Sequence, residues 1–320
     1  MIAGHRHRIH GLTVSAPVRL AAGPATGTSS PDVVFAVGRG PARPPRGIVL
    51  ARHDDPATNR RHMLVSDQNG WCLALGGALR AEIRTEESVV SVTVAGWVPD
   101  DLLSLLLTGP VLTSVCLARG TPLLHASAVV VDEEAWGFVG GSGTGKSTLA
   151  RLLCRLEHPL FSDDALRVDV GVRRITAHRG TTSSRLRTGQ LLEDDPNRAM
   201  RSADGRHVLR DTVTAPDHVP VAAMVLPLLS PHFSVVRAMP CPAATALPLV
   251  ASAHVLEGIC APELLRSQFA LAGQVVSEVP VVRLEVPWGQ RPVPPSLAIE
   301  VQTAVNTVLA EAMAPERRHG

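Results

Sequence analysis

The most constraining stretch of this sequence is FVGGSGTGKSTLARLL, at residues 138–153. It meets the pattern G-x-x-x-x-G-K-[ST] at Gly140, Gly145, Lys146 and Ser147. An apolar run precedes the glycines, and the leucines that follow recur at helical spacing until a proline ends the pattern. The stretch therefore predicts a strand, a tight glycine loop and an amphipathic helix, in the order found in α/β folds.

A loop of this kind has physical reasons to bind phosphate. Its glycines reach backbone conformations closed to other residues, so that consecutive N–H groups turn inward at the positive end of a helix. Lys146 is expected to reach the terminal phosphates and the Ser147 hydroxyl to ligate Mg²⁺. The alternative is a flexible loop without a ligand, and the flanking strand and helix favour the phosphate site. The predicted nucleotide-binding residues are Gly140, Gly141, Ser142, Gly143, Thr144, Gly145, Lys146, Ser147 and Thr148.

An acidic pair, Asp163-Asp164, follows in FSDD. Phosphoryl transfer needs an oxygen ligand for the metal and a group that orients or deprotonates the nucleophile. Both aspartates are candidate catalytic residues, with Asp163 also the expected metal ligand beside Ser147. A solvated turn at a strand end is the alternative. His125, in LLHAS, lies on the strand before the phosphate-loop strand, although a histidine among apolar residues is more often structural.

The rest of the chain divides into a β-rich part and a mixed part. From residue 8 to about 96, short runs rich in Val, Ile and Leu alternate with turn residues, which predicts an antiparallel β-rich module. We therefore expect an N-terminal β-rich domain at 1–97 and a second domain at 98–320. In the second domain we expect a helix at 98–120 interrupted at Gly109-Pro110, strands on both sides of an acidic turn at 132–134, strands at 160–170, 221–229 and 280–287, and helices at 260–278 and 295–313.

Composition excludes some function classes. The formal charge is only +2, aromatic residues are 3% and tyrosine is absent, so we expect no nucleic-acid partner. The five cysteines include no C-x-x-C pair, which favours reduced thiols over a disulfide framework or a zinc site. The N-terminus lacks the apolar region of a secretory signal, and the longest apolar run is expected to be too short on either side of Gly109-Pro110 to cross a bilayer. These features predict a soluble, cytoplasmic protein with no membrane partner.

Three motifs in order, LLHASAVVVD, WGFVGGSGTGKSTLARLL and HPLFSDDALRV, resemble the kinase domain of the HPr kinase/phosphorylase family, which is related in architecture to phosphoenolpyruvate carboxykinase. The resemblance is close over about 98–170 and loose elsewhere. The opening HRIHGLTVSAPV is similar to the first domain of HPr-kinase-related proteins that accompany peptide-modifying gene clusters, including lasso-peptide ones, with His7 in place of a tyrosine. The family's E-x-R-G-type signature cannot be placed in HRGTTSSRLRTGQ, which argues against HPr as the acceptor and against phosphorylase activity.

The resemblance implies an α/β fold, in which a P-loop kinase domain of HPr kinase/phosphoenolpyruvate carboxykinase-like architecture follows a small β-rich domain. It implies that Gly141 to Gly145 and Lys146 bind the triphosphate, that Ser147 binds Mg²⁺, and that the aspartate pair supplies the catalytic base and a metal contact. His125 would assist near the transferred phosphate. The family's oligomeric habit also makes a homo-oligomer an expectation.

The leading hypothesis is a Mg²⁺-requiring kinase that uses ATP or GTP and phosphorylates a hydroxyl, foremost a serine of a peptide or small protein. The alternatives are a small-molecule kinase acting on free serine or a sugar, and a nucleotide-responsive binding module without transfer. The turn-rich segment at 178–207 is a candidate mobile lid. Its arginines Arg185, Arg187 and Arg206 are candidate clamps for phosphate or an acidic acceptor, with a solvated loop as the alternative.

Overall fold

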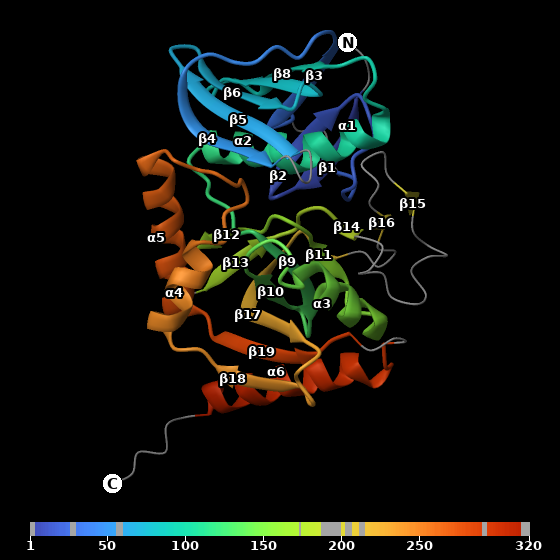
Figure 1. The fold of residues 1–320 in the computed structure, drawn as a ribbon, viewed down its shortest axis with the longest axis vertical. Helices are drawn as coiled ribbons and strands as arrows, with labels where there is room; N and C mark the ends of the chain where they lie inside the picture. Colours follow the sequence, from blue (N-terminus) through green and yellow to red (C-terminus); the bar gives the residue numbers. More distant parts are fainter. Residues whose placement is uncertain are drawn as a thin grey trace.

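A computed structural model of the chain describes residues 4–25, 30–55, 60–172, 174–186, 200–201, 207–210, 215–289 and 293–314. The fold is mixed α/β, with two large sheets stacked along the long axis of the molecule (Figure 1). The first sheet is built from the N-terminal part of the chain and the second from the part that carries the glycine loop.

The first sheet has the strand order β1-β2-β3-β8-β7-β6-β5-β4. Its strands are β1 (His5–Ile9), β2 (Leu12–Ala16), β3 (Val33–Arg39), β4 (Ile48–Asp55), β5 (Arg60–Asp67), β6 (Gly70–Leu75), β7 (Leu79–Ile83) and β8 (Val89–Val94). The expectation of an antiparallel module is correct for most neighbours, but β2 pairs with β3 and β3 pairs with β8 in parallel. The reason is that β3 inserts between β2 and β8 and runs in the same direction as both.

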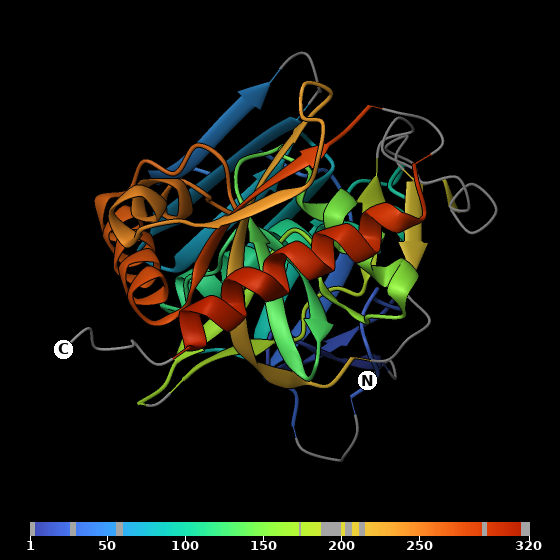
Figure 2. The same cartoon turned by 90° about the horizontal axis from the view of Figure 1, so that it is seen from below.

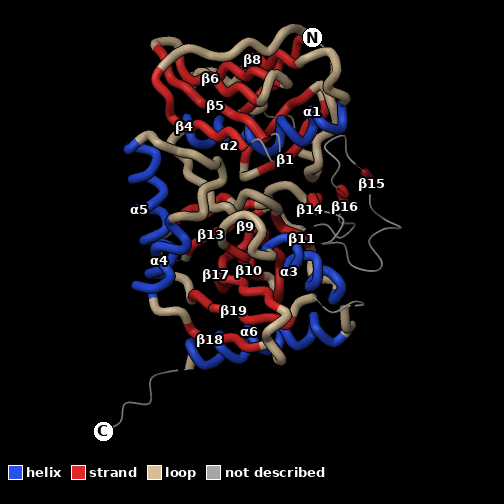
Figure 3. The backbone as a smooth tube through the Cα atoms, in the orientation of Figure 1, coloured by secondary structure: helices blue, strands red, loops and turns tan. Residues whose placement is uncertain are grey.

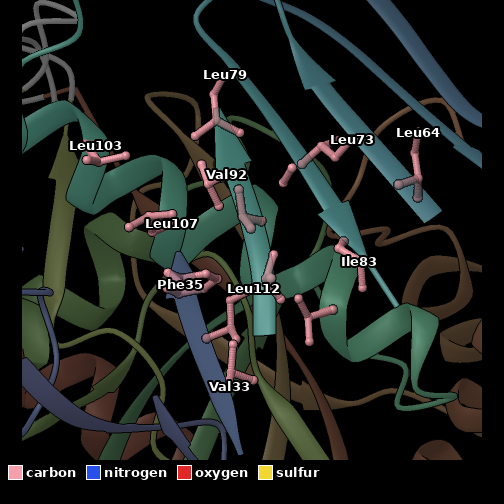
Figure 4. Close-up of a cluster of buried hydrophobic side chains, with 14 of the residues drawn as sticks. Val33, Phe35, Leu64, Leu73, Leu79, Ile83, Val92, Leu103, Leu107 and Leu112 are labelled. Atoms are coloured by element: carbon pink, nitrogen blue, oxygen red, sulfur yellow. The ribbon is translucent and has the colours of Figure 1, made fainter. Parts of the chain in front are cut away.

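One long helical segment packs on this sheet. It comprises α1 (Asp100–Leu106), a π-helical turn η1 (Leu107–Val111) and α2 (Leu112–Ala118). The predicted interruption at Gly109-Pro110 is wrong, because the wider π turn accommodates the proline without ending the helix. Leu103, Leu107 and Leu112 enter the same buried cluster as Phe35 and Val92 of the sheet (Figure 4).

Within the described residues, this segment is the one helix long and apolar enough to cross a membrane, with a mean hydropathy of 1.7. However, 67% of its apolar window is buried inside the molecule. Its leucines therefore serve the core of the first sheet, as those of a core helix in a soluble protein do. The cluster crosses the predicted boundary at residue 97, and the division into two domains stays a prediction.

The second sheet carries the glycine loop. Its main path is β11-β9-β10-β17-β13-β12, and β19 and β18 extend it from β17. The strands are β9 (Ala126–Val131), β10 (Glu134–Val139), β11 (Leu160–Ser162), β12 (Arg167–Val170), β13 (Ile175–His178), β17 (His218–Ser230), β18 (Arg237–Pro240) and β19 (Val281–Pro287). β10, β17 and β19 run parallel at the centre, whereas β9 and β11 are antiparallel to their neighbours.

Alternating side chains of the central strands face two different apolar layers. Phe138 and Val225 pack with α3 (Lys146–Leu153) and α6 (Ser296–Met313), whereas Val139 and Met224 pack toward α4 (Ala243–Ala251) and α5 (Pro262–Glu278). This period of two is what a strand buried on both faces requires. Figure 2 shows α6 lying across the sheet, and Figure 3 shows α4 and α5 on the side away from α3.

The remaining elements are small. A 3₁₀ turn η2 (Cys154–Leu156) ends α3, and β14 (Ser183–Leu186), β16 (His207–Arg210) and β15 (Met200–Arg201) form a three-stranded sheet in the order β14-β16-β15. The predicted strands at 221–229 and 280–287 and the helices at 260–278 and 295–313 are confirmed within a few residues. α4 has no counterpart in the prediction, because Pro248 lies inside it and its short apolar run carries no helical period.

Candidate functional site

The predicted phosphate loop is a glycine turn between the end of β10 and the start of α3, as the sequence pattern requires. Three of its glycines have positive φ, with values of 153° at Gly140, 84° at Gly143 and 98° at Gly145. Gly145 is the N-cap of α3, which has no side-chain cap and no acidic residue in its first turn. The positive end of the helix is therefore left open to an anion.

Lys146 begins α3 and folds back over the loop. Its Nζ donates a hydrogen bond to the Gly141 carbonyl at 2.7 Å, and only 5% of the residue is exposed. Burial lowers the pKa of its ammonium, and the charges of Asp164, Asp163 and Glu257 oppose that shift. Lys146 is also the only lysine in the sequence, whose other permanently charged basic side chains are all arginines. The single lysine ammonium of the sequence therefore lies at this loop.

Asp163 lies directly behind the first turn of α3. Its Oδ1 accepts hydrogen bonds from the hydroxyls of Ser147, at 2.7 Å, and Ser127, at 2.6 Å. The two hydroxyl oxygens are 3.2 Å apart, and Asp163 is 2% exposed. A buried carboxylate is costly unless hydrogen bonds satisfy it, so these two donors stabilise its charged form. The two residues predicted as metal ligands, Ser147 and Asp163, are therefore in direct contact, and their binding of a metal stays a prediction.

Asp164 differs from its neighbour in burial and in backbone conformation. It is partly exposed, and its φ is 68°, in the left-handed region. The Nδ1 of His125 donates a hydrogen bond to the Asp164 carbonyl at 2.8 Å. Burial and then the charge of Lys146 lower the pKa of His125. Because a carbonyl oxygen only accepts, Nδ1 carries a proton in this contact. His125 therefore holds the backbone of the acidic turn. The charges of Lys146 and Asp164 act on the pKa of its ring in opposite directions.

The segment after β13 supports the acidic turn from its other side. The Asp163 amide donates to the Thr181 carbonyl at 3.1 Å, and the Thr181 hydroxyl donates to the Asp163 carbonyl at 2.9 Å. The same segment contacts the N-terminal part of the chain. The amide of His10 donates to the Arg179 carbonyl, and the amide of Thr182 donates to the Ala21 carbonyl. The turn that follows β1 is thereby joined to the site through one short stretch of chain.

The residues present fit a hard divalent cation. Ser147 and Asp163 offer oxygen donors side by side, which is the donor type that Mg²⁺ prefers. Within the described ranges, no group of three or more His, Cys, Asp or Glu side chains could hold a metal ion by itself. A cation here would take its other ligands from phosphate oxygens and water, which is how Mg²⁺ is usually held beside nucleotides.

The candidate arginine clamps are not brought into the site by the described structure. Arg185 lies on β14, where the backbone but not the side chain is described. Arg187 and Arg206 lie outside the described residues, as does most of the candidate lid at 178–207. The clamp and the lid remain predictions.

Sequence reasoning missed two residues of this region. Ser127 stands among apolar residues in ASAVVV, and a polar residue in a fully buried strand is a signal that could have been read. Glu257 lies on the loop between α4 and α5, and its charge partly opposes the lowering of the pKa values of Lys146 and His125. No local pattern announces Glu257, because only the path of the loop beside Leu124 and His125 brings it near.

Comparisons with known proteins give a distant likeness in structure only. No protein-family model matches the chain, and no curated protein matches it. Among solved structures, the chain is similar to one described as the Hpr(Ser) kinase/phosphatase from Coxiella burnetii, with 14% identity and a TM-score of 0.30. The match covers 59% of this chain and 97% of that chain. A likeness of this level carries no argument about activity.

Proposed function

We propose that the chain is a Mg²⁺-dependent phosphotransferase that moves the γ-phosphoryl group of ATP or GTP to a hydroxyl. One observation supports this above all: the phosphate loop, the sole lysine and the hydrogen-bonded Ser147–Asp163 pair meet at the N-terminus of α3. A glycine turn without a ligand has no need of a buried ammonium beside a buried carboxylate. The combination does suit a polyphosphate with its metal ion.

The two aspartates take different parts in this proposal. Asp163 is already engaged by two hydroxyl donors and lies beside Ser147, so it belongs to the cation side. Asp164 is more exposed and is held by its backbone, so its carboxylate is the candidate base for the acceptor. His125 is a positioning residue for Asp164, and bound Mg²⁺ would neutralise charge on the phosphates.

The proposed transfer is a displacement at the γ-phosphorus. The acceptor hydroxyl oxygen forms a bond to the γ-phosphorus, its proton passes to the Asp164 carboxylate, and the bond from the γ-phosphorus to the bridging oxygen breaks. The nucleoside diphosphate leaves with that oxygen. Lys146 leaves the Gly141 carbonyl to contact the phosphates, and the loop amides stabilise the charge that develops on them.

We propose a serine of a peptide or small protein as the acceptor, and this choice rests on the sequence resemblance. The small-molecule alternative is a free serine or a sugar. All five cysteines are free thiols, which suits the reducing cytoplasm, and we place the enzyme there.

The test compares Lys146→Ala, Lys146→Arg and Asp164→Asn with the wild type, using γ-labelled ATP and a panel of serine peptides, free serine and sugars. Both lysine variants are expected to lose transfer by at least ~100-fold, because a guanidinium does not replace the compact ammonium. Asp164→Asn is expected to keep Mg²⁺-dependent nucleotide binding and lose transfer to a similar degree. Arg174→Ala is the matched control, since it removes an exposed cation that pairs with Glu134.

The single lysine provides a second measurement. An amine-selective reagent can modify one side chain of the protein, and peptide mapping separates that product from the N-terminal amine. Nucleotide with Mg²⁺ is expected to protect Lys146 from the reagent. Transfer retained by Lys146→Ala would overturn the proposed function, and hydrolysis without transfer to any member of the panel would favour a nucleotide-responsive binding module.

A further inference from the structure

Ser127 is a hydroxyl in an otherwise apolar row. It is the second residue of β9, in which all six residues are buried, and it lies opposite Phe138 of β10. Strand side chains alternate, so Ser127 shares its face with Val129 and Val131, which pack in the layer of α3 and α6. A serine with no accessible surface on this face points at the first turn of α3 rather than at solvent.

Three oxygens from three separate elements meet at this point. Ser127 from β9 and Ser147 from α3 both donate to Oδ1 of Asp163, which follows β11. The distances are 2.6 Å and 2.7 Å, and the third side of the triangle, between the two hydroxyl oxygens, is 3.2 Å. Two donors on one carboxylate oxygen restrict the rotation of the carboxylate.

The two serines are not equivalent in the presence of a cation. Ser147, at the second position of α3, belongs to the phosphate-loop pattern and offers a lone pair to the metal. Ser127 is further inside the molecule, with no exposed surface, and it lies outside the phosphate-loop pattern. It therefore supplies the fixed half of the support for the carboxylate.

We propose that Ser127 is a positioning residue for a divalent-cation site formed by Ser147 and Asp163, and that it raises the affinity of the protein–nucleotide complex for the cation. This inference rests on the proposed function. A purely structural serine would only satisfy a buried carboxylate, and its loss would lower stability without changing the dependence on Mg²⁺.

The test uses the full chain, a fluorescent ATP analogue and titrations of free Mg²⁺. Ser127→Ala is expected to raise the half-saturating Mg²⁺ concentration about tenfold, the lower end of what loss of a ligand-orienting contact costs. The affinity for nucleotide in EDTA should change less than about twofold, because the loop and Lys146 are untouched. Ser114→Ala is the matched control: Ser114 is equally buried, and its hydroxyl donates to the Pro110 carbonyl in the helix on the first sheet.

A second variant, Ser127→Cys, keeps the size of the side chain but is a weaker donor, so its Mg²⁺ requirement should lie between those of the wild type and Ser127→Ala. If Ser127→Ala does not fold, the cysteine variant decides. The positioning role alone is overturned if the Ser127 variant has the same Mg²⁺ dependence as Ser114→Ala. It is also overturned if that variant loses as much nucleotide affinity in EDTA as it loses with Mg²⁺. A wild-type protein that binds nucleotide identically with Mg²⁺ and with EDTA overturns the proposed function as well.

Discussion

At the scale of single residues, the same side chain type serves different ends depending on what surrounds it. Asp163 and Asp164 are adjacent, yet one is buried under two hydroxyl donors and the other is partly exposed with a left-handed backbone. The left-handed conformation is unfavourable for a non-glycine residue, and the His125 contact to the Asp164 carbonyl helps to maintain it. Local strain of this kind is common where a backbone must present a functional group.

His10 is the residue with the clearest consequence for pH. It is buried, and neither ring nitrogen has a hydrogen-bond partner among the described residues. Burial, followed by the charges of Arg167 and His178, lowers its pKa to about 3. Well above pH 6.5 the ring is neutral in both the folded and unfolded states, so it contributes no pH dependence there. Below that, the unfolded chain binds a proton that the folded protein refuses, and stability falls as the pH falls.

We therefore predict that, between pH 7.5 and pH 5.5, the free energy of unfolding in urea falls more for the wild type than for His10→Asn. The difference should be about 1.4 kcal/mol, the value of one pH unit below the ordinary histidine pKa. Asparagine is chosen because it does not titrate and tolerates the positive φ of 51° at this position. Equal losses in the two proteins would show that other histidines with lowered pKa values carry the whole effect.

At the scale of elements, the start of α3 is set by close contact as well as by backbone conformation. A Cβ at Gly145 would lie 2.6 Å from Cδ2 of Leu229 on β17, in addition to requiring a φ of 98°. A Cβ at Gly143, with a φ of 84°, would meet no atom within 4 Å. The two glycines therefore separate backbone strain from steric contact between the helix and the sheet.

Gly143→Ala is predicted to lower the free energy of unfolding by about 1–2 kcal/mol from strain alone. Gly145→Ala should cost roughly 1–3 kcal/mol more, because Leu229 must move within the packed layer. Chemical denaturation without nucleotide measures both variants and keeps ligand binding out of the comparison. Equal destabilisation would mean that Leu229 moves aside freely.

At the scale of the whole molecule, the first sheet and the loop between α4 and α5 are bound together. The edge strand β4 exchanges backbone hydrogen bonds with this loop, from Arg52 to Gly258 and from Cys260 to Leu50. His53 pairs with the Glu257 carboxylate at 3.1 Å, and His62 contacts the Glu257 carbonyl at 2.7 Å. The loop thus covers the sheet edge and carries Glu257 toward Lys146 and His125.

Gly258→Ala tests this connection, because its Cβ would overlap the carbonyl oxygen of Arg52 and its φ is 72°. We predict a loss of stability of about 3 kcal/mol or more and a weaker affinity for nucleotide, since the loop must leave β4. Gly77→Ala is the matched control: its φ is 76°, but its Cβ would meet no atom within 4 Å. If the two variants unfold at the same denaturant concentration, the loop does not depend on its contact with β4.

The sequence by itself determined the glycine loop, the strand and helix around it, the acidic pair and most of the β-rich first part. These features are local: glycine conformations, helical spacing and strand alternation act over a few residues, so a pattern of letters is enough to state them. Only the tertiary structure decided that Ser127 donates a hydrogen bond to Asp163, that β3 runs parallel to both neighbours and that the helical segment on the first sheet continues through Pro110. It also decided that the charge of Glu257 acts on Lys146 and His125. Each of these depends on which distant segments pack together, and that choice is made by the burial of whole faces rather than by any short stretch of chain.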